Sequence, residues 1–204
     1  TQSAATNFIR EPVNAWNDWY SYLLEIPVWD NLPFLNYGYL PNDQYFENHP
    51  IHVTDVSHLL GLSQNLYTKV LQASEFRGGS ILDVGSGRGG GVTHYARRFP
   101  DAQVTGLEQN KGQWAQCISN TQLPNIHFVR GESNNLPFET NHFDLITCVE
   151  SSHCYEDIDG FLWESRRVLR SGGHLVIADF RDFESSRNLV VQAGEMGLRL
   201  EYKD

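Results

Sequence analysis

The chain has 204 residues, of which 40% are hydrophobic and 20% are charged, and it contains 17 Gly and 8 Pro. These proportions lie near the globular average and argue against collagen-like, disordered and coiled-coil proteins. Acidic residues outnumber basic ones by 25 to 15, and the net charge of −10 argues against nucleic acid or an anionic membrane surface as the main partner.

Cysteine usage and hydropathy indicate the environment in which the protein works. The three cysteines, Cys117, Cys148 and Cys154, cannot all pair within one chain and lack the spacing of a metal site. No apolar run approaches the roughly 20 residues of a membrane span. We therefore expect a cytoplasmic protein with no membrane span and no metal.

Residues 1–75 are predicted to form a helical extension or lid that is rich in aromatic residues. Helices are expected over 12–25 and 56–74, because apolar side chains recur there at helical spacing. The stretch 26–50 contains four prolines and is predicted to be irregular. The aromatic side chains are expected to cover the ligand site, and exposed ones would permit a homodimer.

Residues 76–204 alternate between strand-like and helix-like segments. This alternation predicts an α/β fold, Rossmann-like, with a doubly wound, mostly parallel sheet and helices on both of its faces. Strands are expected over 80–84, 102–108, 125–131, 142–150, 173–180 and 198–202, and helices over 90–99, 110–121, 157–170 and 184–196.

A glycine-rich loop, DVGSGRGGG, runs from Asp83 to Gly91 between the first of these strands and the helix that follows. Glycines let the backbone turn tightly and approach a ligand closely. The N–H groups at the start of the helix can bind a carboxylate or a phosphate. The next strand ends in Glu108, where a carboxylate can accept hydrogen bonds from both hydroxyls of a ribose.

Two kinds of ligand fit this loop. Gly85, Gly87 and Gly90 satisfy the GxGxxG pattern of proteins that bind nicotinamide or flavin dinucleotides. Gly85, Gly87 and Gly89, preceded by Asp83, equally satisfy the GxGxG loop of enzymes that use S-adenosylmethionine. The loop by itself leaves both ligands open.

Segments beyond the loop favour the second ligand. Four segments of the chain together form a pattern: ILDVGSGRGG (81–90), VTGLEQN (104–110), VRGESNNLPFETNHFDLITCVESSHCY (129–155) and VLRSGGHLVIADF (168–180). Over residues 80–203 the sequence resembles the class I S-adenosylmethionine-dependent methyltransferases. The run from Glu150 to Tyr155 and the helix end that follows resemble the phthiotriol and phenolphthiotriol dimycocerosate O-methyltransferases and their small-molecule relatives.

The resemblance implies roles for individual residues, which would all contact the cofactor. Asp83, Gly85, Gly87 and Gly89 would hold its methionine part, Glu108 and Gln109 its ribose, Glu132 and Ser133 would lie near its adenine, and Glu150 and Ser151 would close the fourth strand beside it. Tyr37 or Tyr39 would reach the cofactor carboxylate. Family members also have a last antiparallel strand, which is expected to be missing here.

The acceptor would meet the cofactor just past the fourth strand. His153 lies there and is the candidate general base, because an imidazole changes its charge near neutral pH. The predicted function is methyl transfer from S-adenosylmethionine to a small-molecule or lipid-like acceptor, at a hydroxyl oxygen. An NAD(P)-dependent oxidoreductase and a non-catalytic protein that binds the cofactor or scaffolds a partner remain alternatives.

Overall fold

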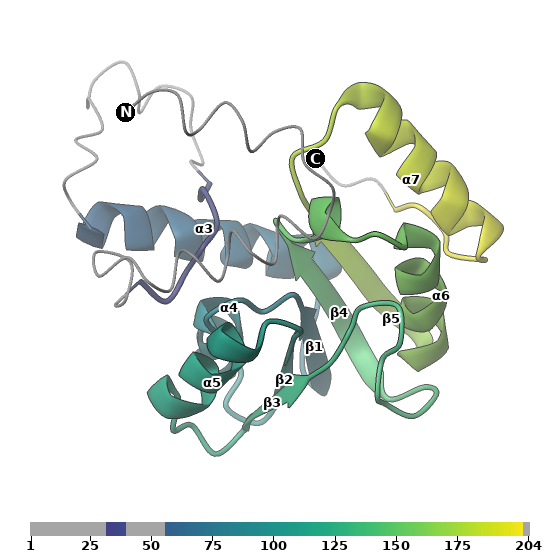
Figure 1. Ribbon diagram of the computed structural model, residues 1–204. Helices are drawn as coiled ribbons and strands as arrows, with labels where there is room; N and C mark the ends of the chain where they lie inside the picture. Colours follow the sequence, from purple (N-terminus) through teal and green to yellow (C-terminus); the bar gives the residue numbers. More distant parts are fainter. Residues whose placement is uncertain (1–31, 40–55, 202–204) are drawn as a thin grey trace.

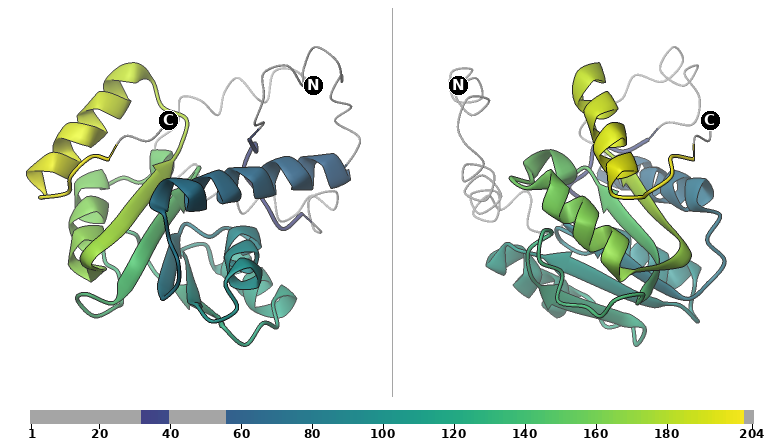
Figure 2. Two further views of the ribbon diagram at one scale, coloured as in Figure 1. Left: turned by 180° about the vertical axis from the view of Figure 1, so that it is seen from behind. Right: turned by 90° about the vertical axis from the view of Figure 1, so that its right-hand side faces the viewer.

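The computed structural model describes residues 32–39 and 56–201, with side chains from residue 60 onward in the second range. The predicted helix over 12–25 and most of the irregular stretch 26–50 lie outside the described residues. A sheet with helices on both faces forms the body of the described part (Figure 1 and Figure 2). In that part, no helix is long and apolar enough to cross a bilayer.

Five strands form one parallel sheet, in the order β3-β2-β1-β4-β5. The strands are β1 (Ser80–Val84), β2 (Gln103–Glu108), β3 (Ile126–Arg130), β4 (Phe143–Val149) and β5 (Leu169–Ala178). The strand order reverses between β1 and β4. The connections that leave these two strands run to opposite sides of the sheet, and the crevice between them is where such sheets bind ligands.

The helices cover the two faces of the sheet unequally (Figure 2). On one face lie α3 (Val56–Ser74), α4 (Gly90–Arg98) and α5 (Lys111–Asn120), and on the other lie α6 (Ile158–Val168) and α7 (Phe183–Glu195). The doubly wound α/β fold predicted from the alternating pattern is thereby confirmed.

Side chains along the central strands point alternately to the two faces of the sheet, which explains why a hydrophobic core lies on each face. In β1, Ile81 packs into the core beneath α3 and α4, where Tyr67 and Tyr95 are also buried. The next residue, Leu82, points to the opposite face and packs into the core beneath α6, around Phe161. Successive strand side chains face opposite sides of a sheet, so a strand buried on both faces is apolar at nearly every position.

The strand expected over 198–202 is wrong for its described part, residues 198–201, which form no strand. The amide of Leu198 donates to the carbonyl of Ala193 at 3.0 Å, so this residue closes the end of α7. Leu198 packs into the core beneath α6, while Leu200 is exposed. The alternating sequence therefore reflects one partly buried residue after a helix, and the described sheet contains no antiparallel strand.

The boundary between α6 and β5 also differs from the prediction. The helix ends at Val168 and β5 begins at once with Leu169, although the helix was expected to run to residue 170 and the strand to begin at residue 173. Gly172 has φ 81° and lies within β5, near the point where the register with β4 shifts. Gly172 and Gly173 therefore lie at an irregularity within the strand.

Candidate active site

A pocket opens at the carboxyl ends of β1, β2 and β4, where the strand order reverses. Its walls come from the loop after β1, the turn after β2, the turn after β4, and the stretch 33–36. Residues 32–39, drawn in purple in Figure 1, are called the strap below. The pocket lies where a doubly wound sheet binds its ligand.

The strap is fixed through its backbone on two sides of the pocket. The carbonyl of Pro33 accepts a hydrogen bond from the Gly90 amide at 3.0 Å, at the start of α4. The amide of Tyr37 donates to the carboxylate of Glu150 at 2.9 Å. Between these points the side chain of Asn36 is buried in the pocket wall, and neither of its polar atoms makes a well-formed hydrogen bond with a described residue.

The glycine loop needs backbone angles that other residues rarely adopt. Gly85, Gly87 and Gly89 have φ values of 75°, 56° and 81°. A Cβ atom on Gly85 would lie 2.5 Å from the hydroxyl oxygen of Ser151, and one on Gly89 would lie 2.8 Å from the ring of Phe128. The loop is therefore close-packed against its neighbours, and its bare backbone forms the floor of the pocket.

Glu108 ends β2 with a carboxylate that faces this loop. Its oxygens accept hydrogen bonds from the amides of Gly87 at 2.9 Å and Asn110 at 2.8 Å. Burial raises the pKa of Glu108 to about 7, although these hydrogen bonds oppose the increase. The carboxyl group is thus placed for a ligand but is only partly ionised at neutral pH.

Asp83 lies below the loop, outside the pocket lining. One carboxylate oxygen accepts a hydrogen bond from the Thr147 hydroxyl at 2.7 Å, and the other has no partner among the described residues. Burial raises the pKa of Asp83 to about 7; the Thr147 hydrogen bond opposes this, and the nearby charge of Glu108 adds to it. Two acidic groups with raised pKa values therefore lie on one side of the pocket, Glu108 in its lining and Asp83 behind it.

The turn after β4 carries the second group of polar side chains. Glu150 has φ 46°, a value that is uncommon for a residue with a side chain. Burial raises its pKa, the hydrogen bond from the Tyr37 amide lowers it, and the charge of Asp179 raises it further. Strained backbone of this kind often lies at functional sites, and here it directs a half-buried carboxylate into the pocket.

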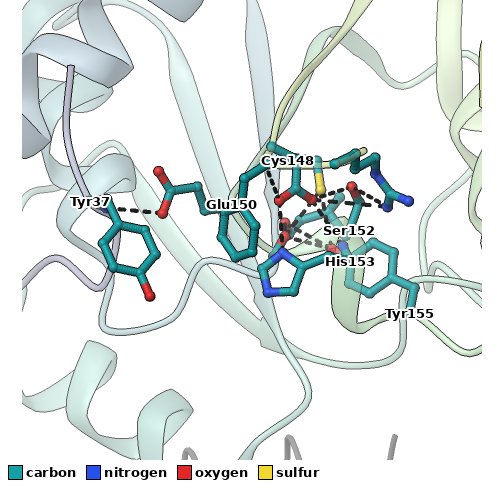
Figure 3. A network of polar contacts seen from close by, with 11 residues as sticks. Tyr37, Cys148, Glu150, Ser152, His153 and Tyr155 are labelled. Carbon is teal, nitrogen blue, oxygen red and sulfur yellow. Dashed lines mark hydrogen bonds and ion pairs between the residues drawn. The ribbon is translucent and has the colours of Figure 1, made fainter. Parts of the chain in front are cut away.

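His153, which is labelled in Figure 3, lies in this turn and pairs with Asp179. Nδ1 of His153 lies 2.7 Å from Oδ1 of Asp179, whose side chain is only 2% exposed. The carboxylate also accepts hydrogen bonds from the Ser152 hydroxyl at 2.5 Å and the His153 amide at 2.9 Å. Burial raises the pKa of Asp179, but these hydrogen bonds outweigh burial and leave it below its ordinary value.

Most of the predicted site residues come together at the pocket. Its lining includes Gly85, Gly87, Glu108, Gln109, Ser133, Glu150 and Ser151. Asp83 and Gly89 lie behind that lining. His153 lies next to it, because its neighbour Cys154 is one of the lining residues.

Three predicted residues lie elsewhere. The side chain of Glu132 is exposed and outside the lining. The ring of Tyr37 is 81% exposed, so that only its backbone amide reaches Glu150. The ring of Tyr39 lies 5.8 Å from the Lys69 ammonium, away from the pocket lining.

Sequence reasoning missed three residues of the site. Asp179 immediately follows β5, and its position at the carboxyl end of a strand next to β4 was a usable signal. Gln113 is buried in α5 and directs an unpartnered amide oxygen toward the loop. Asn36 had no sequence signal, because only the course of the strap brings it to the pocket.

The sequence is similar to a known protein family and to several characterised proteins. Residues 82–177 match the model of a family described as "Methyltransferase domain". The phthiotriol/phenolphthiotriol dimycocerosates methyltransferase of Mycobacterium leprae is 35% identical over 173 residues, which cover 81% of this chain and 60% of that protein. The fatty-acid O-methyltransferase of Mycolicibacterium smegmatis is 37% identical over 74% of this chain and 54% of that protein. The chain thus spans about 60% of the length of the first of these relatives.

Solved structures share the fold. The [4+2]-cyclase SpnF superposes with a TM-score of 0.74 at 20% identity, over 91% of this chain and 72% of that chain. Geranyl diphosphate C-methyltransferase from Streptomyces coelicolor, solved with S-adenosyl-L-homocysteine, superposes with a TM-score of 0.63 at 20% identity, over 82% and 65% of the two chains. Residues 82–177 thus match a methyltransferase domain, and the described part of the chain has the fold of these solved structures.

Proposed function

We propose that this protein transfers a methyl group from S-adenosylmethionine to a hydroxyl oxygen of a lipid-like small molecule. The observation that carries the proposal is the His153–Asp179 pair, 2.7 Å apart, beside a pocket built from a glycine loop and an acidic strand end. A hydroxyl must lose its proton to accept a methyl group, and a histidine oriented by a buried carboxylate is a suitable base.

The pocket residues fit S-adenosylmethionine. Glu108 is placed to accept the ribose hydroxyls, and the buried oxygen of Gln113 faces the same region. The amide of Asn36 offers both a donor and an acceptor, which suits the ammonium and carboxylate of the methionine part. Glu150 supplies negative charge near a cationic ligand.

The chain's own residues account for the proton transfer. When bound, the cofactor supplies an electrophilic methyl group on a sulfonium. Asp179 fixes the imidazole of His153 through Nδ1, so that Nε2, the other ring nitrogen, is the basic nitrogen. Nε2 takes the proton of the acceptor hydroxyl as its oxygen gains the methyl group. Asp179 stabilises the imidazolium that results, since its carboxylate remains ionised.

The cofactor assignment is tested by calorimetric titration with S-adenosylmethionine, S-adenosylhomocysteine and NADH. Both sulfur compounds are expected to bind and NADH is not. Glu108→Ala should weaken the sulfur compounds by about 10–100-fold, because hydrogen bonds to a charged group contribute about 1.5–3 kcal/mol. Glu139→Ala is the matched control, since Glu139 is exposed and remote from the lining. Binding of NADH alone would favour an oxidoreductase and contradict the proposal.

Cofactor affinity should also depend on pH. The pKa of Glu108 is raised to about 7 without ligand, and the ionised form is the one that accepts two ribose hydroxyls. Protonation therefore opposes binding below pH 7, and the Kd for S-adenosylmethionine should fall about tenfold from pH 6 to pH 8. Glu108→Gln should reduce this dependence without abolishing it, because Asp83 titrates in the same range. If the Kd of Glu108→Gln depended on pH as strongly as that of the parent protein, Glu108 would not be part of the binding site.

A further inference from the structure

A second cavity, of about 610 Å³, lies between the strap and the outer face of α4. The strap is bonded to the helices on either side of its course. The carbonyl of Pro33 accepts from the Gly90 amide of α4 at 3.0 Å, and the amide of Tyr39 donates to the carbonyl of Leu62 in α3 at 2.9 Å. The volume of the cavity lies within the range of sites that bind small molecules.

The lining of this cavity is basic. The described lining residues include three basic side chains, Arg88, His94 and Arg97, and no aspartate or glutamate. Gln64 and Asn120 add side-chain amides, which can donate hydrogen bonds. The whole chain carries a net charge of −10, so this cavity is a local exception to its overall charge. Such a lining favours a negatively charged ligand.

The two arginines border the cavity in different ways. Arg88 is only 4% exposed, and its guanidinium donates to the carbonyl of Leu32 in the strap at 3.4 Å. Arg97 is exposed in the last turn of α4, and it forms no ion pair with any residue in the described part of the chain. The planar guanidinium group matches the oxygens of a phosphate, which accept two parallel hydrogen bonds from it.

His94 precedes Arg97 by three positions, so the two side chains share a face of α4. The Thr68 hydroxyl donates to the carbonyl of Gln64 at 3.0 Å, and its oxygen therefore accepts from Nε2 of His94 at 3.1 Å. Nδ1 is then the nitrogen that gains a proton when the ring becomes charged. Burial lowers the pKa of His94, and the nearby charge of Arg98 lowers it further, so the ring is neutral at pH 7 until an anion binds beside it.

We infer that this cavity binds the phosphate group of a small phosphate monoester between Arg88, His94 and Arg97. A phosphate dianion balances the two permanent charges, and the remaining volume leaves room for the organic group of the ester. Arg97 and His94 border this cavity and not the pocket at the carboxyl ends of the strands. The site is therefore additional to the one that the proposed function uses.

The site is tested by calorimetric titration of the whole chain with glycerol 3-phosphate at pH 7, with chloride as the other anion. Saturable binding to one site per chain is expected. Arg97→Gln should weaken it by at least about fivefold, because one charge beside the phosphate is lost. Arg166→Gln is the matched control and should bind like the parent protein. Arg166 is also an exposed arginine in the last turn of its helix, but α6 covers the opposite face of the sheet.

The contribution of His94 is tested with sulfate, whose own charge is constant between pH 5.5 and pH 8. A bound anion makes the ring hold its proton more tightly, so binding takes up a proton and strengthens as the pH falls. The Kd should decrease by at least about fivefold from pH 8 to pH 5.5. Beside the ring lie Arg98 on its own helix and the Tyr67 and Tyr95 phenols, whose pKa values burial raises well above the usual range, so none of these groups titrates here.

His94→Gln should remove most of this pH dependence. A Kd that fell as steeply in that variant as in the parent protein would contradict the role of His94. Residual dependence from the other acidic and basic groups of the chain is present in both proteins and does not enter the comparison.

Two sources of the phosphate group are distinguished with phosphatidylcholine vesicles that contain or lack phosphatidic acid. Vesicle binding that requires phosphatidic acid and that glycerol 3-phosphate displaces would assign the site to a lipid head group. Binding of glycerol 3-phosphate alone would assign it to a soluble ester. The absence of saturable binding to either, or equal affinity in Arg97→Gln and Arg166→Gln, would overturn the inference. No arm of the experiment measures methyl transfer, so such a failure would leave the proposed function standing.

Discussion

Replacing His153 with alanine should lower kcat by about 10²–10⁴ while the Kd for S-adenosylmethionine stays within about twofold of the parent protein. The decrease in kcat is the usual contribution of a positioned general base. The Kd should change little because His153 lies beside the pocket lining and not in it. Single-turnover methylation of decan-1-ol and calorimetric titration measure the two quantities separately.

A loss of activity from misfolding is distinguished by rescue. Added imidazole should restore part of the turnover of His153→Ala, because the removed group is itself an imidazole. Asp179→Asn should lower kcat by about 10–100-fold, since the ring would lose the carboxylate that holds its tautomer and stabilises its charge. Imidazole should not rescue that variant. Near-normal turnover in His153→Ala would remove His153 from the mechanism.

Replacing Gly85 with alanine should weaken cofactor binding by at least about 100-fold and lower the free energy of unfolding by about 2–3 kcal/mol. The residue has φ 75°, and a Cβ atom there would lie 2.5 Å from the Ser151 hydroxyl oxygen and 2.6 Å from its Cβ. Backbone strain and overpacking each cost about 1–3 kcal/mol. The loop must shift to relieve the clash, which displaces the floor of the pocket. Calorimetric titration and thermal unfolding measure the two effects, the second as a Tm decrease of about 5–10 °C.

Gly61→Ala is the matched control for this substitution. Gly61 lies inside α3, and a Cβ atom there would meet nothing within 4 Å. Alanine favours helices over glycine by about 1 kcal/mol, so this variant should be more stable than the parent and should bind the cofactor unchanged. If Gly85→Ala behaved like Gly61→Ala in both measurements, the loop could not be the close-packed floor that its geometry indicates.

Local patterns were sufficient to predict the body of the fold. The apolar runs of β1, β2 and β4 follow from burial on both faces, and the glycine loop follows from its position between β1 and α4. Most predicted cofactor residues lie at carboxyl ends of strands, which the parallel topology brings together. These features depend on the order of residues along short segments, and sequence carries that information directly.

Features that depend on long-range contact could not be predicted in the same way. The strap reaches the pocket because Tyr37 bonds Glu150, across 113 positions of sequence. That hydrogen bond uses the backbone amide, so the residue type gives no sign of it. Tyr37 or Tyr39 was expected to reach the cofactor carboxylate, but neither ring lines the pocket, whereas the side chain of Asn36 does. The expected strand over 198–202 was misleading for a related reason, since alternation of apolar residues cannot tell a paired strand from a helix end with one buried anchor.

The strap links the two halves of the pocket mechanically. It joins Gly90, at the start of α4, to Glu150, just after β4, and between these points it forms a wall of the pocket. Loss of these two hydrogen bonds would remove that wall and widen the opening of the pocket. Under the proposed function, the opening rate of this segment would then bear on how fast the cofactor and its spent form exchange, and product release could limit turnover even where methyl transfer is fast.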